Sequence, residues 1–378
     1  MLALSALSVF LPLVAALRGV PESKSTVRVS RFNVGNITAV GIASALVTPV
    51  LPGHENATSA MYSFLIEHGS RKMLFDLGLR KDTENFAPSI AALFGANGVF
   101  VAELDGDITD MLETAGIPPR DIEAVVWSHA HFDHTGDMSK FPDSTKLVIG
   151  TETDTSTYPA NPNASLLESD LSGRNVTKID FAASNLTFND LKAFDYFGDG
   201  SFYLVDTPGH LTGHLTALAR VTPSPNPTFI LLGGDTFFHP GQARPRPALQ
   251  ESFPCPAHFL HAANAHISTD YFFSPGSHDG PHGGGFDLRT RASALLSISD
   301  LPDGFATDPV LAEVSLEKVA RWDADEDVLV LITHDLSVVS NDTLPYFPHS
   351  LNGWKKGGWK EKAVWNFLDV ESSVWRFS

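Results

Sequence analysis

Short apolar runs bounded by polar turns dominate the central part of the chain. Residues 61–79 contain two such runs around a polar turn with a glycine, which predicts a β-hairpin. Residues 107–115 carry Ile, Met and Leu at helical spacing, and two prolines follow before the apolar run 124–127. This order predicts a helix that leads into a strand.

The same order returns near the end of the chain. Residues 315–322 have a helical pattern, a polar turn follows, and residues 328–332 are fully apolar. Two further apolar runs, 202–205 and 229–232, each continue into a loop that contains glycine. We therefore expect strands whose ends lead into polar loops, and such loops can hold chemically active side chains on a rigid sheet.

Two regions interrupt this pattern, and we expect both to be insertions in a single domain of residues 17–378. Residues 151–190 have few apolar runs and three Asn-x-Ser/Thr sequences, which predicts an exposed excursion. Residues 240–310 are rich in Pro, Gly, His and aromatic residues, and this composition favours a lid or pocket wall.

The N-terminal residues indicate export from the cell. Residues 1–16 are uncharged and mostly apolar, and they are too short to cross a bilayer comfortably, which is typical of a signal peptide. An uncleaved anchor is the alternative. A secreted glycoprotein also agrees with six possible N-glycosylation sites, at Asn36, Asn56, Asn163, Asn175, Asn185 and Asn341.

Composition narrows the possible partners. The 378 residues carry a formal net charge of −18, so the chain has no basic field for nucleic acid or for an anionic membrane surface. We expect a small-molecule substrate. Cys255 is the only cysteine, and we expect it to be a small buried side chain and not a nucleophile. The oligomeric state stays open.

The sequence SHAHFDH holds the strongest chemical signal. It places three imidazoles and a carboxylate, those of His129, His131, Asp133 and His134, directly after the apolar run 124–127. A single histidine is usually an ordinary polar residue, but this density is typical of a metal-ligand cluster.

Three further candidate ligands each follow an apolar run: His210 in DTPGHLTGH, Asp235 in LLGGDTFF and His334 in LITHDL. Taken singly, each has an ordinary structural explanation. Together with the first loop they make five His and two Asp, enough to hold two four- or five-coordinate zinc ions if one carboxylate is shared.

These four ordered motifs resemble the metallo-β-lactamase superfamily. The resemblance implies an α/β fold, a four-layer αββα sandwich with the metals at one edge. It implies one zinc on His129, His131 and His210, and a second on Asp133, His134 and His334, with Asp235 bridging. It also implies that Asp76 and His214 support the site without binding metal.

Within the superfamily, the sequence is most similar to the quorum-quenching lactonases. This similarity implies hydrolysis of a lactone or ester by a metal-bridging hydroxide, with Asp133 orienting the hydroxide and moving a proton. Those lactonases usually have a tyrosine where this chain has Phe238, so His239 or a group of the 240–310 insertion replaces its hydroxyl, or the substrate differs.

Three alternatives remain open from the sequence. A glyoxalase-II-like thioesterase shares the metal loop, and an iron-dependent oxygenase shares the fold, since these ligands do not choose between zinc and iron. A metal-binding module without catalysis is the third. The aromatic residues of the 240–310 insertion favour a substrate with a hydrophobic acyl or aryl group.

Overall fold

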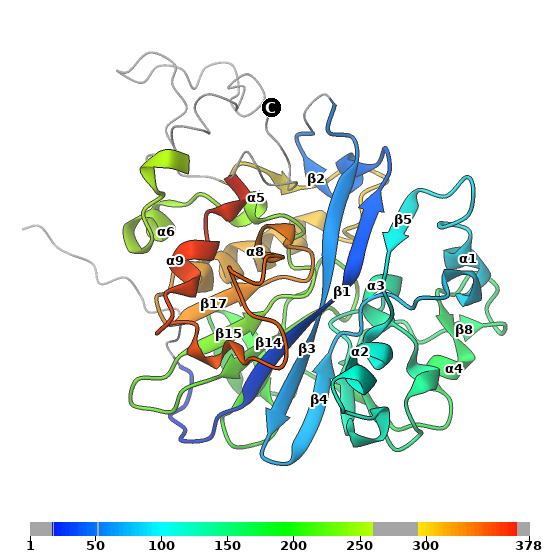
Figure 1. Cartoon of the computed structure of the whole chain (residues 1–378), viewed down its shortest axis with the longest axis horizontal. Coiled ribbons are helices and arrows are strands. Elements are labelled where there is room, and N and C mark those ends of the chain that lie inside the picture. The colour runs from blue at the N-terminus through cyan, green and yellow to red at the C-terminus, as the bar shows by residue number, and fades with distance from the viewer. Residues whose placement is uncertain (1–16, 18, 51–52, 260–293, 369–378) are drawn as a thin grey trace, which may run out of the picture.

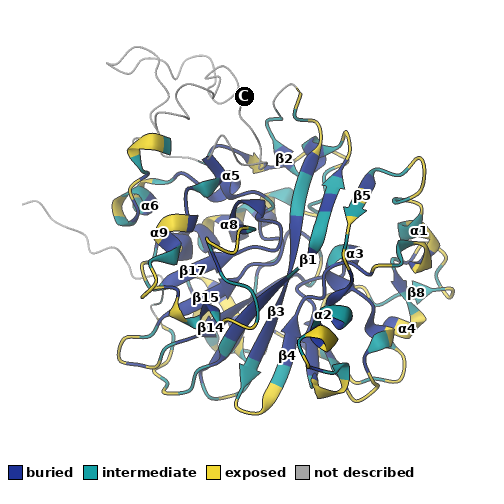
Figure 2. Ribbon diagram, in the orientation of Figure 1, coloured by how far each residue is buried: buried dark blue, intermediate teal, exposed yellow. Residues whose placement is uncertain are grey.

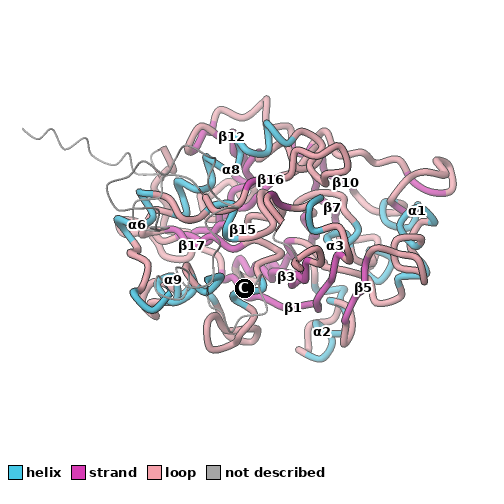
Figure 3. The backbone as a smooth tube through the Cα atoms, turned by 90° about the horizontal axis from the view of Figure 1, so that it is seen from above, coloured by secondary structure: helices cyan, strands magenta, loops and turns pink. Residues whose placement is uncertain are grey.

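The computed structural model describes residues 17, 19–50, 53–259 and 294–368. Two β-sheets lie face to face in the middle of the molecule, with helices on both outer sides (Figure 1). Seen from above, α8 (Pro309–Asp323) and α2 (Ile108–Thr114) lie on opposite sides of the strands (Figure 3). The arrangement is the four-layer αββα sandwich that the sequence resemblance implies.

The larger sheet has seven strands and combines antiparallel and parallel pairing. Strands β5, β1, β3 and β4 pair antiparallel, whereas β4, β6, β7 and β10 pair parallel. In spatial order the strands are β10 (Val176–Ile179), β7 (Lys146–Gly150), β6 (Ala124–Val126), β4 (Arg71–Phe75), β3 (Ala57–His68), β1 (Arg28–Ala39) and β5 (Phe100–Glu103).

The smaller sheet has six strands, and only its last pair is parallel. In spatial order they are β11 (Leu186–Phe188), β12 (Leu191–Asp195), β13 (Phe202–Asp206), β14 (Leu215–Arg220), β15 (Phe229–Leu232) and β17 (Val328–Leu331). Two short pairs lie outside the sheets, β2 (Val47–Thr48) with β16 (Ser297–Ile298) and β8 (Thr157–Tyr158) with β9 (Leu166–Leu167).

The described helices are mostly short. They are α1 (Pro88–Ala91), α2 (Ile108–Thr114), α3 (Phe132–Thr135), α4 (Glu168–Leu171), α5 (Pro240–Ala243), α6 (Pro247–Ser252), α8 (Pro309–Asp323) and α9 (Trp359–Ala363). The side chain of Asp107 caps α2 by accepting from the backbone N–H groups of Thr109 and Asp110. Among the described residues, no helix has the length and apolar character needed to cross a membrane.

Strand alternation explains the layers, because successive side chains point to opposite faces of a sheet. On β3, Phe64 and Ile66 pack between the two sheets, whereas Leu65 packs against the layer that contains α2. Leu316 and Val319 of α8 pack on the outer face of the smaller sheet. Figure 2 shows the buried sheets and the exposed outer turns. The strands are therefore buried on both faces, as their continuous apolar runs require.

The element predictions for the central chain are confirmed. The hairpin of residues 61–79 corresponds to β3 and β4, the helix of residues 107–115 to α2, and the run 124–127 to β6. The runs 202–205, 229–232 and 328–332 form β13, β15 and β17. The helix expected at residues 315–322 is longer, since α8 begins at Pro309.

The two regions expected to be insertions differ from each other. Within residues 151–190 the chain forms β8, β9 and α4, but it also supplies β10, the edge strand of the larger sheet. Only part of this region is therefore an excursion. The expected signal peptide and residues 260–293 of the second region lie outside the described residues. Cys255 is described and is buried in a hydrophobic cluster, as expected.

Candidate metal centre

Four loops at one edge of the sandwich bring the predicted ligands together. The loop after β6 carries His129, His131, Asp133 and His134, and the loops after β13, β15 and β17 carry one ligand each. The side chains form two groups. The first is His129, His131, His210 and Asp235, and the second is Asp133, His134 and His334. All seven residues predicted from the sequence are thus gathered in one place.

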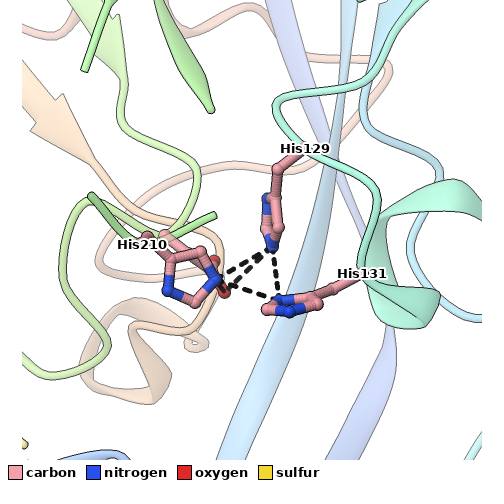
Figure 4. A group of neighbouring side chains, drawn as sticks. His129, His131 and His210 are labelled. Atoms are coloured by element: carbon pink, nitrogen blue, oxygen red, sulfur yellow. Dashed lines mark hydrogen bonds and ion pairs between the residues drawn. The ribbon is translucent and has the colours of Figure 1, made fainter. Parts of the chain in front are cut away.

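In the first group, three imidazoles converge on one point (Figure 4). His129 Nε2 lies 2.8 Å from His131 Nδ1, and His210 Nε2 lies 3.1 and 3.0 Å from these two atoms. Ligand nitrogens around a tetrahedral zinc ion are about 3.3 Å apart, given Zn–N distances near 2.0–2.1 Å. The spacing of the three nitrogens is close to that of a metal-binding triad.

The second group combines imidazoles with a carboxylate. His334 Nε2 lies 3.4 Å from Asp133 Oδ2, and His134 Nε2 lies 4.0 Å from Asp133 Oδ1. Asp133 keeps 13% of its side chain exposed, whereas His134 is fully buried. Asp133 is therefore accessible from outside the group, whereas His134 is not.

Asp235 lies between the two groups. Its Oδ2 is 3.7 Å from His129 Nε2 and 3.6 Å from His210 Nε2, on the side of the first group. Its Oδ1 is 3.2 Å from His134 Nε2 and 3.3 Å from His334 Nε2, on the side of the second. One carboxylate thus presents one oxygen to each group, which is the geometry of a shared ligand.

The backbone around Asp235 is held by His214. His214 Nδ1 donates to the Thr207 carbonyl at 2.8 Å, and Nε2 accepts from the Asp235 backbone N–H at 3.1 Å. Gly234 precedes Asp235 with a φ of +51°, and a Cβ there would lie 2.9 Å from His214 Nε2. The glycine therefore permits the close approach of the ring, and His214 belongs to neither ligand group.

Asp76 supports the ligand loop after β6 through hydrogen bonds. Its Oδ1 accepts from the Ser128 backbone N–H at 2.7 Å, and its Oδ2 accepts from Ser128 Oγ at 2.8 Å. The same Oδ2 accepts from His134 Nδ1 at 2.9 Å, so the ring turns its Nε2 toward the centre. Such a partner fixes both the tautomer and the orientation of a ligand histidine.

His334 is oriented in a similar way by the larger sheet. Its Nδ1 donates to the carbonyl of Ala60 in β3 at 2.9 Å. The backbone N–H of Tyr62 in the same strand donates to the Thr333 carbonyl at 3.3 Å. Strand β3 therefore fixes the loop after β17, although the two segments belong to different sheets.

The electrostatics of the two groups are opposite. Burial lowers the pKa of His129 and His210 well below the ordinary value, and the neighbouring imidazoles lower it further. In the second group, the carboxylates outweigh burial and raise the pKa of His134 well above its ordinary value and also raise that of His334. Burial opposes ionisation of Asp235, but His134 and His334 hold its pKa well below the usual range.

Two buried polar atoms test whether this centre suits a metal ion. His134 Nε2 and Asp235 Oδ1 lie 3.2 Å apart, yet neither has a hydrogen-bond partner among the described residues. An unpartnered buried polar atom is costly, and natural structures keep few of them. A cation between these atoms would satisfy both. The donor set of imidazoles and carboxylates therefore fits zinc or a similar transition metal.

A pocket opens onto the two groups. Four predicted ligands, His131, Asp133, Asp235 and His334, form its polar end. Its other described lining residues are apolar or aromatic except Ser59: Ile37, Ala39, Leu46, Ala57, Phe100, Phe132, Phe238 and Phe305. Phe305 belongs to residues 240–310, where the sequence favours a lid or pocket wall. The sequence did not indicate the rest of the wall, because most of it comes from β1, β3 and separate loops.

Phe238 lines the pocket and contacts one histidine of each ligand group. Its ring stacks on His334 with centroids 5.8 Å apart and meets the edge of His210 at 5.1 Å. His239 does not line this pocket; its Nδ1 accepts from the Gly241 backbone N–H and caps α5. His239 therefore does not stand in this pocket for the hydroxyl that is missing at Phe238.

Comparison with known proteins gives a consistent picture. Residues 60–334 match the model of the metallo-beta-lactamase superfamily. The metallo-hydrolase mfmC of Annulohypoxylon moriforme is 36% identical over 359 residues, which cover 93% of this chain and 89% of that protein. The gamma-lactamase FDB1 of Fusarium pseudograminearum is 34% identical over 92% of this chain and 83% of that protein.

Other similarities are partial or concern the fold alone. The cytochrome P450 monooxygenase mpaDE' of Penicillium brevicompactum is 36% identical over 94% of this chain, but the chain spans only 39% of that protein. A solved N-acyl homoserine lactone hydrolase with bound N-hexanoyl-L-homoserine superposes with a TM-score of 0.53. It is 17% identical and covers 86% of this chain and 99% of its own, which shows a shared fold.

Proposed function

The chain belongs to the metallo-β-lactamase superfamily, and from that premise we propose that it is a dinuclear zinc hydrolase that opens an uncharged cyclic ester or amide. The observation that carries the proposal is the position of Asp235. It presents one oxygen to each of two ligand groups at the end of an apolar pocket. A purely structural zinc site is closed and does not need such an opening.

Two metal ions fit the residues present. His129, His131 and His210 would hold one, and Asp133, His134 and His334 the other, with Asp235 shared. When bound, such ions polarise an acyl oxygen and make a water molecule acidic enough to act as a nucleophile near neutral pH. The two groups differ in charge, so we expect the all-imidazole triad and the carboxylate-containing group to differ in affinity.

Asp133 is the side chain best placed to move a proton. It lines the pocket, is partly exposed, and has two oxygens at 3.4 Å and 4.0 Å from the imidazoles of its group. A carboxylate here can orient a water molecule, accept its proton and pass that proton to the leaving oxygen or nitrogen. The buried Asp235 faces the ligand imidazoles on both sides and is less suited to this role.

The pocket favours an uncharged substrate with an apolar or aryl group. None of its described lining residues is Lys or Arg, and four of them are phenylalanines. Recognition of a carboxylate would ordinarily use a cationic side chain, so the charged thiol carrier of a thioesterase substrate fits poorly. Relatives named as gamma-lactamases and as a metallo-hydrolase support a small cyclic acyl compound.

Zinc as the natural metal and a secreted, glycosylated form are part of the same proposal. They rest on the donor set and on the sequence of residues 1–16 with its six possible glycosylation sites. Expression of the full chain in a secreting host, with analysis of the mature N-terminus, tests the second point. An intracellular product that retains residues 1–16 would contradict it.

Metal content and hydrolysis measured together test the main proposal. The purified chain should contain about two zinc ions by mass spectrometry. It should hydrolyse uncharged γ-lactones or γ-lactams, lose this activity on treatment with a chelator and regain it with zinc. Absence of bound metal, or hydrolysis that is indifferent to the chelator, would overturn the proposal.

A further inference from the structure

Ser59 is the only residue of the described pocket lining that is polar and not a predicted metal ligand. The other lining residues are four predicted ligands and eight apolar or aromatic side chains. Phe238, which contacts one histidine of each ligand group, has no hydrogen-bond donor on its side chain. An acyl substrate that enters the pocket therefore meets one uncommitted hydroxyl.

The register of β3 directs Ser59 into the pocket. Ser59 pairs with Ile37 and Ala57 pairs with Ala39, and all four residues line the pocket on one face of the two strands. The next residue, Ala60, is on the opposite face in the core between the sheets. Its carbonyl accepts from His334 Nδ1 at 2.9 Å, which places Ser59 next in sequence to the point where β3 holds a predicted ligand.

The Ser59 hydroxyl is also available. It is half-buried, and no described residue forms a hydrogen bond with its Oγ, whereas Thr58 Oγ1 on the other face pairs with Thr38 Oγ1 at 2.9 Å. Ser128 Oγ, a hydroxyl next to the predicted ligand His129, is by contrast engaged with Asp76. A hydroxyl in an otherwise apolar wall is the kind of polar group that fixes a ligand's orientation.

We propose that the Ser59 hydroxyl donates a hydrogen bond to the acyl oxygen of the substrate and so positions the scissile bond against the two ligand groups. This proposal rests on the proposed hydrolysis of a cyclic ester or amide. Ser59 is a substrate-positioning and specificity-determining residue in this scheme, and it takes no part in proton transfer. The preferred substrate is uncharged, with its acyl oxygen on the β3 side of the pocket.

Two isosteric probes separate the possible contacts: 2-coumaranone, a γ-lactone fused to a benzene ring, and oxindole, the corresponding γ-lactam. Both carry the acyl oxygen, but only oxindole has a ring N–H. Ser59→Ala should lower kcat/KM about tenfold for both probes, the worth of one neutral hydrogen bond. Ser59→Thr retains a hydroxyl and should stay close to the parent enzyme.

Controls exclude a structural effect. Thr38→Val removes a hydroxyl from the neighbouring strand that does not line the pocket, and it should leave both rates unchanged. Zinc content and Tm of Ser59→Ala should match those of the parent, because no hydrogen bond within the described protein is lost. A loss of metal or a lower Tm would assign Ser59 a structural role and overturn the proposal.

The remaining outcomes separate this proposal from the proposed function. Hydrolysis of both probes at parental rates by Ser59→Ala would overturn the role of Ser59 while leaving the hydrolase intact. A loss confined to oxindole would mean that the hydroxyl accepts from the ring N–H, which also contradicts the proposal.

Equilibrium binding of oxindole to the zinc-loaded parent and to Ser59→Ala, measured by calorimetry, covers the case in which neither probe is hydrolysed. About tenfold weaker binding by the variant would then support the contact although the hydrolase proposal had failed for these probes. Equal binding by the two proteins, or no binding by either, would overturn the contact as well.

Discussion

Two buried polar clusters in this molecule are built from similar groups but satisfied very differently. In one, Arg244 Nε and Nη2 donate to the two carboxylate oxygens of Asp323 at 2.7 and 2.9 Å, and Nη1 donates to the Val364 carbonyl at 2.8 Å. In the other, the metal centre, His134 Nε2 and Asp235 Oδ1 have no hydrogen-bond partner among the described residues.

The difference indicates what each cluster is for. The Arg244–Asp323 pair joins the loop after α5 to the end of α8 and the C-terminal segment, and its charges are matched within the protein. The candidate metal centre keeps two buried atoms without a partner among the described residues, at the end of an open pocket. A fully satisfied buried cluster stabilises a fold, whereas an incompletely satisfied one indicates a binding site.

Replacement of the shared ligand should give the largest effect and should separate the two clusters. Asp235→Asn removes the charge that faces both ligand groups, so we expect loss of at least one zinc ion and about a thousandfold lower kcat/KM. Kinetics with an active lactone or lactam and metal analysis by mass spectrometry measure both. Circular dichroism should show an intact fold, since the side chain lies at a loop and not within the strands.

The matched control is Asp121→Asn, which makes the same chemical change at an exposed residue that precedes β6, whereas the ligand loop follows that strand. It should retain parental metal content and activity. If Asp235→Asn kept both zinc ions and full activity, the distinction between the two clusters would fail, because the shared carboxylate would then be dispensable.

Breaking the satisfied cluster should lower stability and leave the chemistry intact. Arg244→Met strands the buried Asp323 carboxylate without its partner, and we expect the free energy of unfolding to fall by about 3–5 kcal/mol. Urea denaturation of the zinc-loaded protein measures this fall. Activity per folded molecule and metal content should remain close to those of the parent.

A double variant gives the control for this result. Arg244→Met combined with Asp323→Leu replaces both charges by apolar groups and should regain most of the lost stability. If the single variant were as stable as the parent, the pair would not be a structural cluster in the sense argued above.

The sequence identifies the side chains that gather at the candidate metal centre, because its signals are local. Each ligand directly follows an apolar run, so strand and loop could be identified together without knowing the strand order. Asp76 and His214 came from the family resemblance, and the structure places both in contact with ligand residues. Catalysis by Asp133 and metal binding at the centre stay predictions.

The rest required the tertiary structure. Ser59 and Ile37 enter the pocket through the register of β1 with β3, which no local pattern specifies. The start of α8 was missed although Asp308 caps the helix and a proline follows at the first turn. Val310 is 75% exposed and Val314 44%, so apolar residues on the outer face obscured the helical pattern there.

A third buried charge, that of Lys360 near Asp323, should make the stability of the protein depend on pH. Burial lowers the pKa of Lys360 from 10.5 to about 8, although Asp323 opposes the shift. Between these pH values the unfolded chain binds this proton and the folded chain releases it, so raising the pH through this window favours folding. Across the whole window, the free energy of unfolding should rise by about 3 kcal/mol.

Lys360→Met has no titratable amine at this position and therefore tests the predicted pH dependence of stability. Urea denaturation at pH 8 and pH 10 should show a relative gain for the parent over the variant as the pH rises, because only the parent is relieved of a buried charge. The hydrogen bonds that Lys360 Nζ donates to the carbonyls of Asp325 and Val328 are lost in the variant at both pH values. A parallel response of the two proteins would show that Lys360 does not titrate in this window.

Weakening the support of one ligand should give the smallest effect and shows how far the metal centre depends on its satisfied surroundings. Asp76 adopts a φ of +57°, a conformation that Asn tolerates better than most residues, so Asp76→Asn should fold. The amide has one acceptor oxygen where the carboxylate has two, so the contacts with Ser128 and His134 cannot all persist. We expect zinc affinity to fall about 10- to 100-fold.

Competition with a chelator of known affinity measures this loss, and the comparison that matters is with Asp235→Asn. Asp76→Asn should regain the parent's zinc content and activity at high zinc concentration, because every ligand atom is still present. Asp235→Asn should not recover, because a ligand itself is missing. If excess zinc failed to restore Asp76→Asn, Asp76 would have to act on the reaction directly. It would then belong to the reactive centre and not to the hydrogen-bonded residues that support it.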